Sequence, residues 1–167
     1  VPANSVQAAS LKIRYSGKTR YYKGKQLHVS YANKNLSSKY VGIQINKVNM
    51  IPYYDYLVKQ GPKVKRTYSK SSGKLILKNG DDTLTAYVGK RTYYLNGIKK
   101  TFSVAPTKVK YYKTKKTIIL IPANAIVKGL GLNYKYSSSS KRIYITQPVI
   151  PSDSTTQVQT QPSGSVQ

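Results

Sequence analysis

The sequence is poor in the residues that enzymes use most. Among its 167 residues it has no cysteine and no tryptophan, one histidine, and four acidic residues, all of them aspartate. General acid–base catalysis draws mostly on histidine or on paired carboxylates, so this composition disfavours a catalytic function. The absence of cysteine agrees with many exported proteins of Gram-positive bacteria. No apolar run approaches the roughly 18 residues of a membrane-spanning helix, and no transmembrane segment is expected.

Positive charge is what the chain has in excess. Lysine and arginine number 29, which gives a formal net charge of +25. The apolar share of 39% is ordinary, so we expect a folded protein to carry this charge rather than a disordered tail. Charge of this size exceeds what solubility requires and destabilises the compact state by self-repulsion. An anionic polymer would relieve the repulsion, and teichoic acid, acidic polysaccharide and extracellular nucleic acid are the candidate partners.

The two ends of the chain differ in composition from the rest. Residues 1–10 place Val6 and Ala8 at the spacing of a signal-peptidase site, so we expect either a signal-peptide remnant or a flexible arm. Residues 148–167 are rich in Ser, Thr, Gln and Pro and can bury too little apolar surface to offset their chain entropy. We predict a disordered linker or tail there. The protein is expected to be secreted or held at the surface of a Gram-positive bacterium.

Three short motifs occur twice, in the same order. Residues 17–22 recur as 89–94, Ile51-Pro52 recurs as Ile121-Pro122, and residues 74–77 correspond to 141–145. The offset between the copies drifts from 72 to about 68 residues. We interpret this as an internal duplication, with repeat 1 at residues 11–79 and repeat 2 at residues 83–147.

Turn and strand signals recur through the repeats. Asn96-Gly97 lies between apolar and aromatic runs and predicts a type I′ hairpin turn, since both residues tolerate positive φ. Leu132, Tyr134 and Tyr136 alternate with polar residues, which is the period of a half-buried strand. These signals predict antiparallel sheets.

One short helix is expected in each repeat. Pro52 and Pro122 each suit the first helical position, where a missing N–H costs nothing. The apolar residues expected to face the core are Tyr54, Leu57 and Val58 in repeat 1, and Ala123, Ile126, Val127 and Leu130 in repeat 2. The predicted fold class is therefore α+β: two tandem small units, each a twisted antiparallel β-sheet wrapped around one short α-helix, followed by a disordered C-terminal tail.

Repeat 2 resembles a known family. Its markers, in chain order, are Leu95-Asn96-Gly97, Val104-Ala105-Pro106, Ile121-Pro122 before a helix, and Gly129-Leu130-Gly131 before a closing pair of strands. This pattern is similar to the copper amine oxidase N-terminal-like domain, or stalk domain, over residues 40–147 and more loosely over 11–40. The resemblance implies a non-catalytic accessory module of exported and surface proteins of Gram-positive bacteria, often beside a separate enzymatic domain.

The family name raises the question of oxidase activity. A copper site needs a cluster of histidines, and His28 is the only imidazole in the chain. The run from Tyr53 to Tyr56 lacks the asparagine that precedes a topaquinone tyrosine. Asp55 suits a helix start, and Asp81-Asp82 suits a turn. We therefore expect no catalytic, cofactor-binding or metal-binding residue, and no enzymatic activity.

Two basic clusters are the expected binding residues. The predicted anion-binding side chains are those of Lys63, Lys65, Arg66, Lys108, Lys110, Lys113, Lys115 and Lys116, with Tyr111 and Tyr112 predicted to stack on a ligand. Two alternatives stay open: lysines also protect strand edges from aggregation, and tyrosine is common in strands. The protein is thus expected to bind an anionic cell-wall polymer, with a non-specific nucleic-acid binder or a spacer for a following enzymatic domain as alternatives. The sequence identifies neither the ligand nor the oligomeric state.

Overall fold

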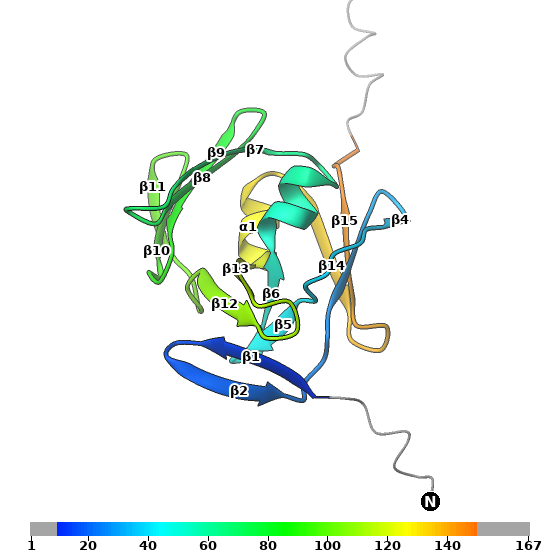
Figure 1. Cartoon of the computed structure of the whole chain (residues 1–167). Coiled ribbons are helices and arrows are strands. Elements are labelled where there is room, and N and C mark those ends of the chain that lie inside the picture. The colour runs from blue at the N-terminus through cyan, green and yellow to red at the C-terminus, as the bar shows by residue number, and fades with distance from the viewer. Residues whose placement is uncertain (1–9, 150–167) are drawn as a thin grey trace, which may run out of the picture.

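The computed structural model describes residues 10–149 (Figure 1). Strands dominate this range, with two short helices, η2 (Tyr54–Lys59) and α1 (Ala123–Gly129). The coarse α+β prediction is confirmed. The expected N-terminal arm and C-terminal tail fall, apart from residues 10, 148 and 149, outside the described residues. Within the described range no helix is long and apolar enough to cross a membrane.

The largest sheet has six antiparallel strands. Their order is β2 (Lys18–Tyr22), β1 (Leu11–Tyr15), β12 (Thr107–Tyr111), β13 (Lys116–Pro122), β6 (Val48–Pro52) and β5 (Ile43–Ile45). Strands β12 and β13 lie in its middle, β6 lies between β13 and the edge strand β5, and the β1–β2 hairpin extends the other side.

Two smaller sheets complete the fold. The five-stranded sheet has the order β11 (Ile98–Thr101), β10 (Thr92–Leu95), β9 (Asp82–Tyr87), β8 (Lys74–Asn79) and β7 (Lys65–Ser69). The four-stranded sheet has the order β14 (Asn133–Ser137), β15 (Arg142–Thr146), β3 (His28–Tyr31) and β4 (Lys34–Asn35). The β15–β3 pairing is parallel. Asn96 and Gly97 join β10 to β11 at φ of 52° and 82°, as the predicted turn requires.

The expectation of one separate sheet for each repeat needs correction. Every sheet combines strands of residues 11–79 with strands of residues 83–147: β1 pairs with β12, β6 with β13, β8 with β9, and β15 with β3. The physical reason is size. A hairpin and a short helix cannot bury their apolar faces alone, whereas pairing across the repeats completes wider sheets around both helices.

The two repeats meet at equivalent strands. Ile51 of β6 lies opposite Ile121 of β13, and these isoleucines belong to the duplicated Ile-Pro motif. The residue equivalent to each one lies 70 positions away in the other repeat. Replacing both members of the pair Pro52–Leu120 by their equivalents gives the pair Pro122–Met50, which is also observed. The pairing therefore has local two-fold symmetry, as an isologous dimer interface would have.

This central strand pair separates two apolar clusters. Ile51 and Ile121 are fully buried on the side that packs against both helices, among Leu57, Ile126 and Val127. Met50 and Leu120 point to the other side and pack with Ile13, Ile43 and Val109. Because successive side chains of a strand point to opposite faces, β6 and β13 contribute residues to both clusters and so connect them.

The helix after each Ile-Pro motif is present, but the two differ. In α1 the predicted apolar residues Ala123, Ile126 and Val127 are all buried. In repeat 1 the segment is a π-helix, in which Tyr56 and Leu57 are buried and Tyr54 is exposed. The predicted stripe that included Tyr54 is therefore wrong, because a π-helix bonds residues i and i+5 and does not follow the 3.6-residue period.

Replacing either central isoleucine tests the role of the strand pair. We expect Ile121→Ala or Ile51→Ala to lower the free energy of unfolding by about 2–5 kcal/mol, because each leaves a cavity in the core. Ile98→Ala is the control: Ile98 is 63% exposed, and its loss should change stability by no more than about 0.5 kcal/mol. Urea unfolding followed by circular dichroism measures all three. Equal, small effects would contradict the central position of the pair.

Candidate anion-binding face

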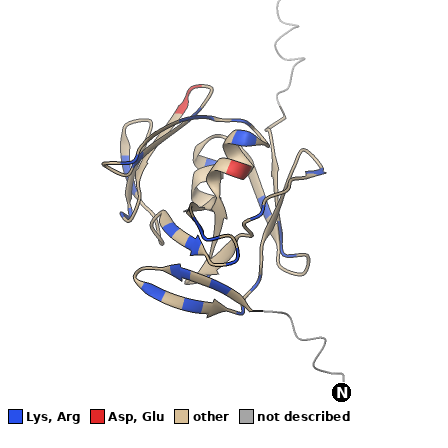
Figure 2. Cartoon of the chain, in the orientation of Figure 1, with Lys and Arg blue, Asp and Glu red and all other residues tan. Residues whose placement is uncertain are grey.

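Cationic side chains gather on one face of strands β1 and β12. On β1, Lys12 and Arg14 point away from the fully buried Ile13. Arg14 lies opposite Lys110 of β12, which places Lys108 and Lys110 on the same face as the two β1 cations. We call Lys12, Arg14, Lys108 and Lys110, together with Tyr21 and Tyr112, the basic face. Figure 2 shows the blue bands of these neighbouring strands at the lower side of the molecule.

The basic face is the uncovered continuation of the surface beneath the helices. Lys108 lies opposite Ile119 of β13, so by alternation it shares a face with Ile121, which contacts the helix-side cluster. Helices cover this face at the centre of the sheet but not at β1 and β12 (Figure 1). The surface there is a sheet face open to solvent, which suits an extended ligand better than a small enclosed one.

Two ammonium groups contact the ring of Tyr112. The Nζ atoms of Lys12 and Lys110 lie 4.5 and 4.9 Å from the centroid of the Tyr112 ring. Lys12 Nζ also lies 5.9 Å from the ring of Tyr21, which is 62% exposed. Cation–π attraction stabilises each ammonium group here, while the two positive charges repel each other.

Thr19 fixes the far end of the Tyr112 ring. The Thr19 and Tyr112 hydroxyls are hydrogen-bonded at 3.2 Å, and Arg14 Nη1 donates to Thr19 Oγ1 at 3.0 Å. The pKa of Tyr112 is lowered, chiefly by the bond with Thr19 and further by the charges of Lys110, Arg14 and Lys12. The site therefore favours negative charge at this position.

The nearest partners of the carboxylates are neutral groups elsewhere in the fold. Asp55 Oδ2 accepts a hydrogen bond from Ser38 at 2.6 Å, and Asp82 Oδ1 accepts one from Asn96 at 2.9 Å. Both lie outside the strands of the basic face. Neither of these two carboxylates therefore neutralises a cation of the basic face.

The structure divides the second predicted cluster between β12 and the turn that follows it. Lys108 and Lys110 lie on the basic face, whereas Lys113, Lys115 and Lys116 lie in the turn and at the start of β13, where all three are exposed. Tyr112 lies beside Lys12 and Lys110 of the basic face, and its stacking on a ligand stays a prediction.

The prediction that Tyr111 stacks on a ligand is wrong. Tyr111 is only 3% exposed, its hydroxyl donates to the Val41 carbonyl at 2.7 Å, and its ring meets Tyr40 edge-on at 5.2 Å. Burial raises its pKa. The reason is alternation: Tyr111 points to the same side of β12 as the buried Val109, and Tyr112 to the opposite side.

The first predicted cluster lies apart, on β7 and the loop before it. Lys63 and Lys65 line a pocket of about 340 Å³ together with Lys78, which lies directly opposite Lys65 on β8. Arg66 is engaged within the protein: its Nη1 donates to Tyr53 at 3.1 Å, and its guanidinium lies 4.9 Å from the Tyr54 ring centroid. The predicted anion-binding residues thus form two separate patches.

His28 is exposed at the start of β3. Its pKa is lowered by burial and by the charges of Arg142 and Lys141. Within residues 10–149 no group of three His, Cys, Asp or Glu side chains could hold a metal ion.

A family model described as the copper amine oxidase N-terminal domain matches residues 31–145. The match covers well over half of the chain. The protein belongs to the copper amine oxidase N-terminal domain family. This confirms the resemblance found in repeat 2, and the domain is the non-catalytic part of the copper amine oxidases. Comparisons with curated proteins and with solved structures give no match.

The basic face extends beyond the copper amine oxidase N-terminal domain as matched. The match begins at residue 31, so the β1–β2 hairpin with Lys12, Arg14 and Tyr21 precedes it. Lys108 and Lys110 lie within it. The face is therefore formed where an additional hairpin pairs with a strand of the family domain.

The opposite pKa shifts of two adjacent tyrosines provide a test of this geometry. In protein labelled with ¹³C at tyrosine Cζ, we expect Tyr112 to titrate below the ordinary value of 10.0 and Tyr111 above it. Thr19→Val removes the largest cause of the shift and should raise the Tyr112 midpoint without moving that of Tyr111. An unchanged Tyr112 midpoint in the variant would contradict the arrangement of the basic face.

Proposed function

We propose that this chain is a non-catalytic binding module of an exported or wall-associated protein of a Gram-positive bacterium, and that its basic face holds an anionic cell-wall polymer. The observation that carries the proposal is the pair of ammonium groups, of Lys12 and Lys110, held over the single ring of Tyr112. A bound anion between or beside them would replace repulsion by attraction.

The spacing of the cations suits a repeating polyanion. Residues two apart on a strand lie about 7 Å from each other, and neighbouring strands about 5 Å apart, so the four cations form a compact array. A polymer with one charge in each repeat unit, such as teichoic acid or an acidic polysaccharide, can contact several of them at once. Each contact adds to the affinity through release of counterions, as it does for nucleic-acid phosphates.

A nucleic-acid binder is the second candidate, and one specific observation favours it. Tyr21 is 62% exposed beside Lys12, and exposed aromatic rings next to cations are the elements that stack on unpaired bases. A spacer role, in which binding belongs to another domain, would leave the basic face without a ligand.

Wall retention of charge variants tests the proposal. We expect purified walls to retain the wild-type chain at about 50 mM salt and to lose it as salt rises, with a slope of about 0.7–0.9 in log K per phosphate contacted. The triple variant Lys12→Gln, Lys108→Gln, Lys110→Gln should bind at least tenfold more weakly. The control triple variant Lys74→Gln, Lys99→Gln, Lys100→Gln removes the same charge from exposed positions of the five-stranded sheet and should bind within twofold of wild type.

Two outcomes would contradict wall-polymer binding. One is equal retention on walls stripped of teichoic acid and acidic polysaccharide, and the other is an equal loss of binding in both triple variants. Oligonucleotides serve as a parallel ligand, and tighter binding to them than to wall polymer would favour the second candidate. No retention on any of these ligands would leave the spacer role.

A further inference from the structure

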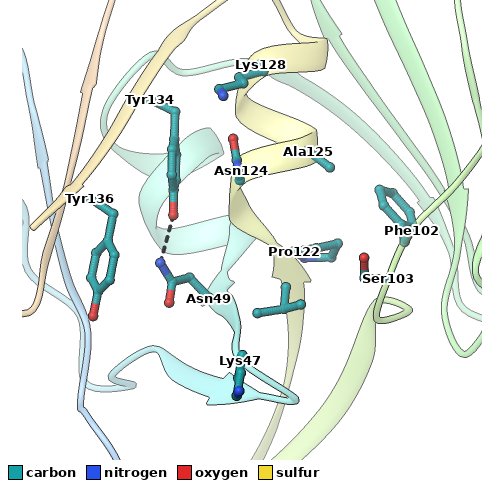
Figure 3. Close-up of a pocket in the computed structure, with 11 residues that line it drawn as sticks. Lys47, Asn49, Phe102, Ser103, Pro122, Asn124, Ala125, Lys128, Tyr134 and Tyr136 are labelled. Carbon is teal, nitrogen blue, oxygen red and sulfur yellow. Dashed lines mark hydrogen bonds between the residues drawn. The ribbon is translucent and has the colours of Figure 1, made fainter. Parts of the chain in front are cut away.

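A pocket of about 570 Å³ opens beside helix α1 at the β6 end of the six-stranded sheet, away from strands β1 and β12 of the basic face (Figure 3). Four segments distant in sequence form it. They are the turn and strand with Lys47 and Asn49, the loop with Phe102 and Ser103, the end of β13 with helix α1, and strand β14 with Tyr134 and Tyr136. Its size is typical of sites for small ligands, about 300–1,000 Å³. The lining residues include two lysines and no acidic residue.

The two tyrosines form one wall of the pocket, and hydrogen bonds from two side-chain amides fix the positions of their hydroxyls. Asn49 Nδ2 donates to the Tyr134 hydroxyl at 2.9 Å, as the dashed line in Figure 3 marks, and Gln44 Nε2 donates to Asn49 Oδ1 at 2.9 Å. Gln44 Nε2 also reaches the Tyr136 hydroxyl at 3.5 Å. Burial raises the pKa of Tyr134, so its hydroxyl is neutral at physiological pH. The rings are thus held in place before any ligand binds, which lowers the cost of binding.

Polar groups face this wall from helix α1. Figure 3 shows Asn124 across from the Tyr134 ring, Lys128 at one end of the pocket and Lys47 at the other. Asn124 and Lys128 are exposed, so a ligand can reach both. The amide can both donate and accept hydrogen bonds, and the lysines supply charge.

The corresponding place in repeat 1 is already filled by the protein. Tyr134 of β14 corresponds to Arg66 of β7, and Asn124 corresponds to Tyr54 of η2. The Arg66 guanidinium packs on the Tyr54 ring at 4.9 Å between strand and helix. In repeat 2 the same position carries the tyrosine wall and stays open, so this pocket distinguishes the two copies.

We propose that this pocket binds a pyranose ring that carries a carboxylate. The C–H face of a sugar ring packs on an aromatic ring such as that of Tyr134, and the amides of Asn49 and Asn124 suit its hydroxyls. A lysine at either end suits the carboxylate. A uronic acid of an acidic polysaccharide and the muramic acid of peptidoglycan share this chemistry. The proposal does not depend on the basic face, which lies on other strands.

Titration of the ¹⁵N-labelled full chain tests the proposal. The probes are D-glucuronate, N-acetylmuramic acid and D-glucose. We expect at least one acidic sugar to shift the side-chain amide signals of Asn49 and Asn124 saturably, with a Kd in the millimolar range, and glucose to bind at least tenfold more weakly. The tighter of the two acidic sugars indicates the natural source.

Variants make the test specific to the pocket. Tyr134→Ala should weaken the acidic sugar at least tenfold. Asn124→Asp, at an exposed position that does not threaten the fold, should weaken it comparably by repelling the carboxylate. Tyr144→Ala is the control on the same hairpin, since Tyr144 is 37% exposed on the opposite face of β15, and it should bind within twofold of wild type.

Three results would overturn the proposal: binding by Asn124→Asp equal to that of wild type, glucose binding as tightly as both acidic sugars, or shifts confined to the amides of β1 and β12. The triple variant of the basic face should bind the acidic sugar normally. The two proposals can therefore fail separately: the wall-retention assay of the triple variant tests the basic face, and the sugar titration of the pocket variants tests the pocket.

Discussion

The antiparallel pairing of β6 with β13 is the contact on which the rest of the structure depends. It joins the two copies of the Ile-Pro motif, and each strand continues directly into a helix, so both helices start from the same place in the sheet. One side of the pair carries Ile51 and Ile121 into the helix-side core, and the other carries Met50 and Leu120 into the second core. Residues 11–79 and 83–147 thereby form one structure with shared sheets.

Departures from the two-fold symmetry create the surfaces that a ligand can use. Strand β12 has the β1–β2 hairpin on its outer side, whereas its counterpart β5 is an edge strand of the same sheet. That hairpin brings Lys12 and Arg14 beside Lys108 and Lys110. The second departure lies between strand and helix. In repeat 1 Arg66 and Tyr54 pack together and fill this position, whereas in repeat 2 Tyr134 and Asn124 leave it open as the pocket. The two halves of the chain thus present two different surfaces, at which we propose the two binding sites.

Local signals in the sequence predicted local structure well. The Asn96-Gly97 turn and the buried face of α1 followed from short-range patterns. The partners of the strands did not, because alternation shows which face a side chain occupies but not which strand lies beside it. The contribution of Lys12 was missed for that reason, since β12 lies about 100 residues further on. Tyr111 is different: its alternation with Val109 indicates burial, whereas its position among lysines favoured a role in ligand contact.

The central functional claim is that anionic polymer contacts the basic face rather than the charge of the protein as a whole. The most direct measurement is an NMR titration of the labelled chain with polyglycerol phosphate at moderate salt. The account predicts that the amide signals of β1 and β12, with the Tyr112 ring, shift first and saturate together. Shifts spread evenly over all lysine-bearing strands, or centred on Lys63, Lys65 and Lys78, would contradict it.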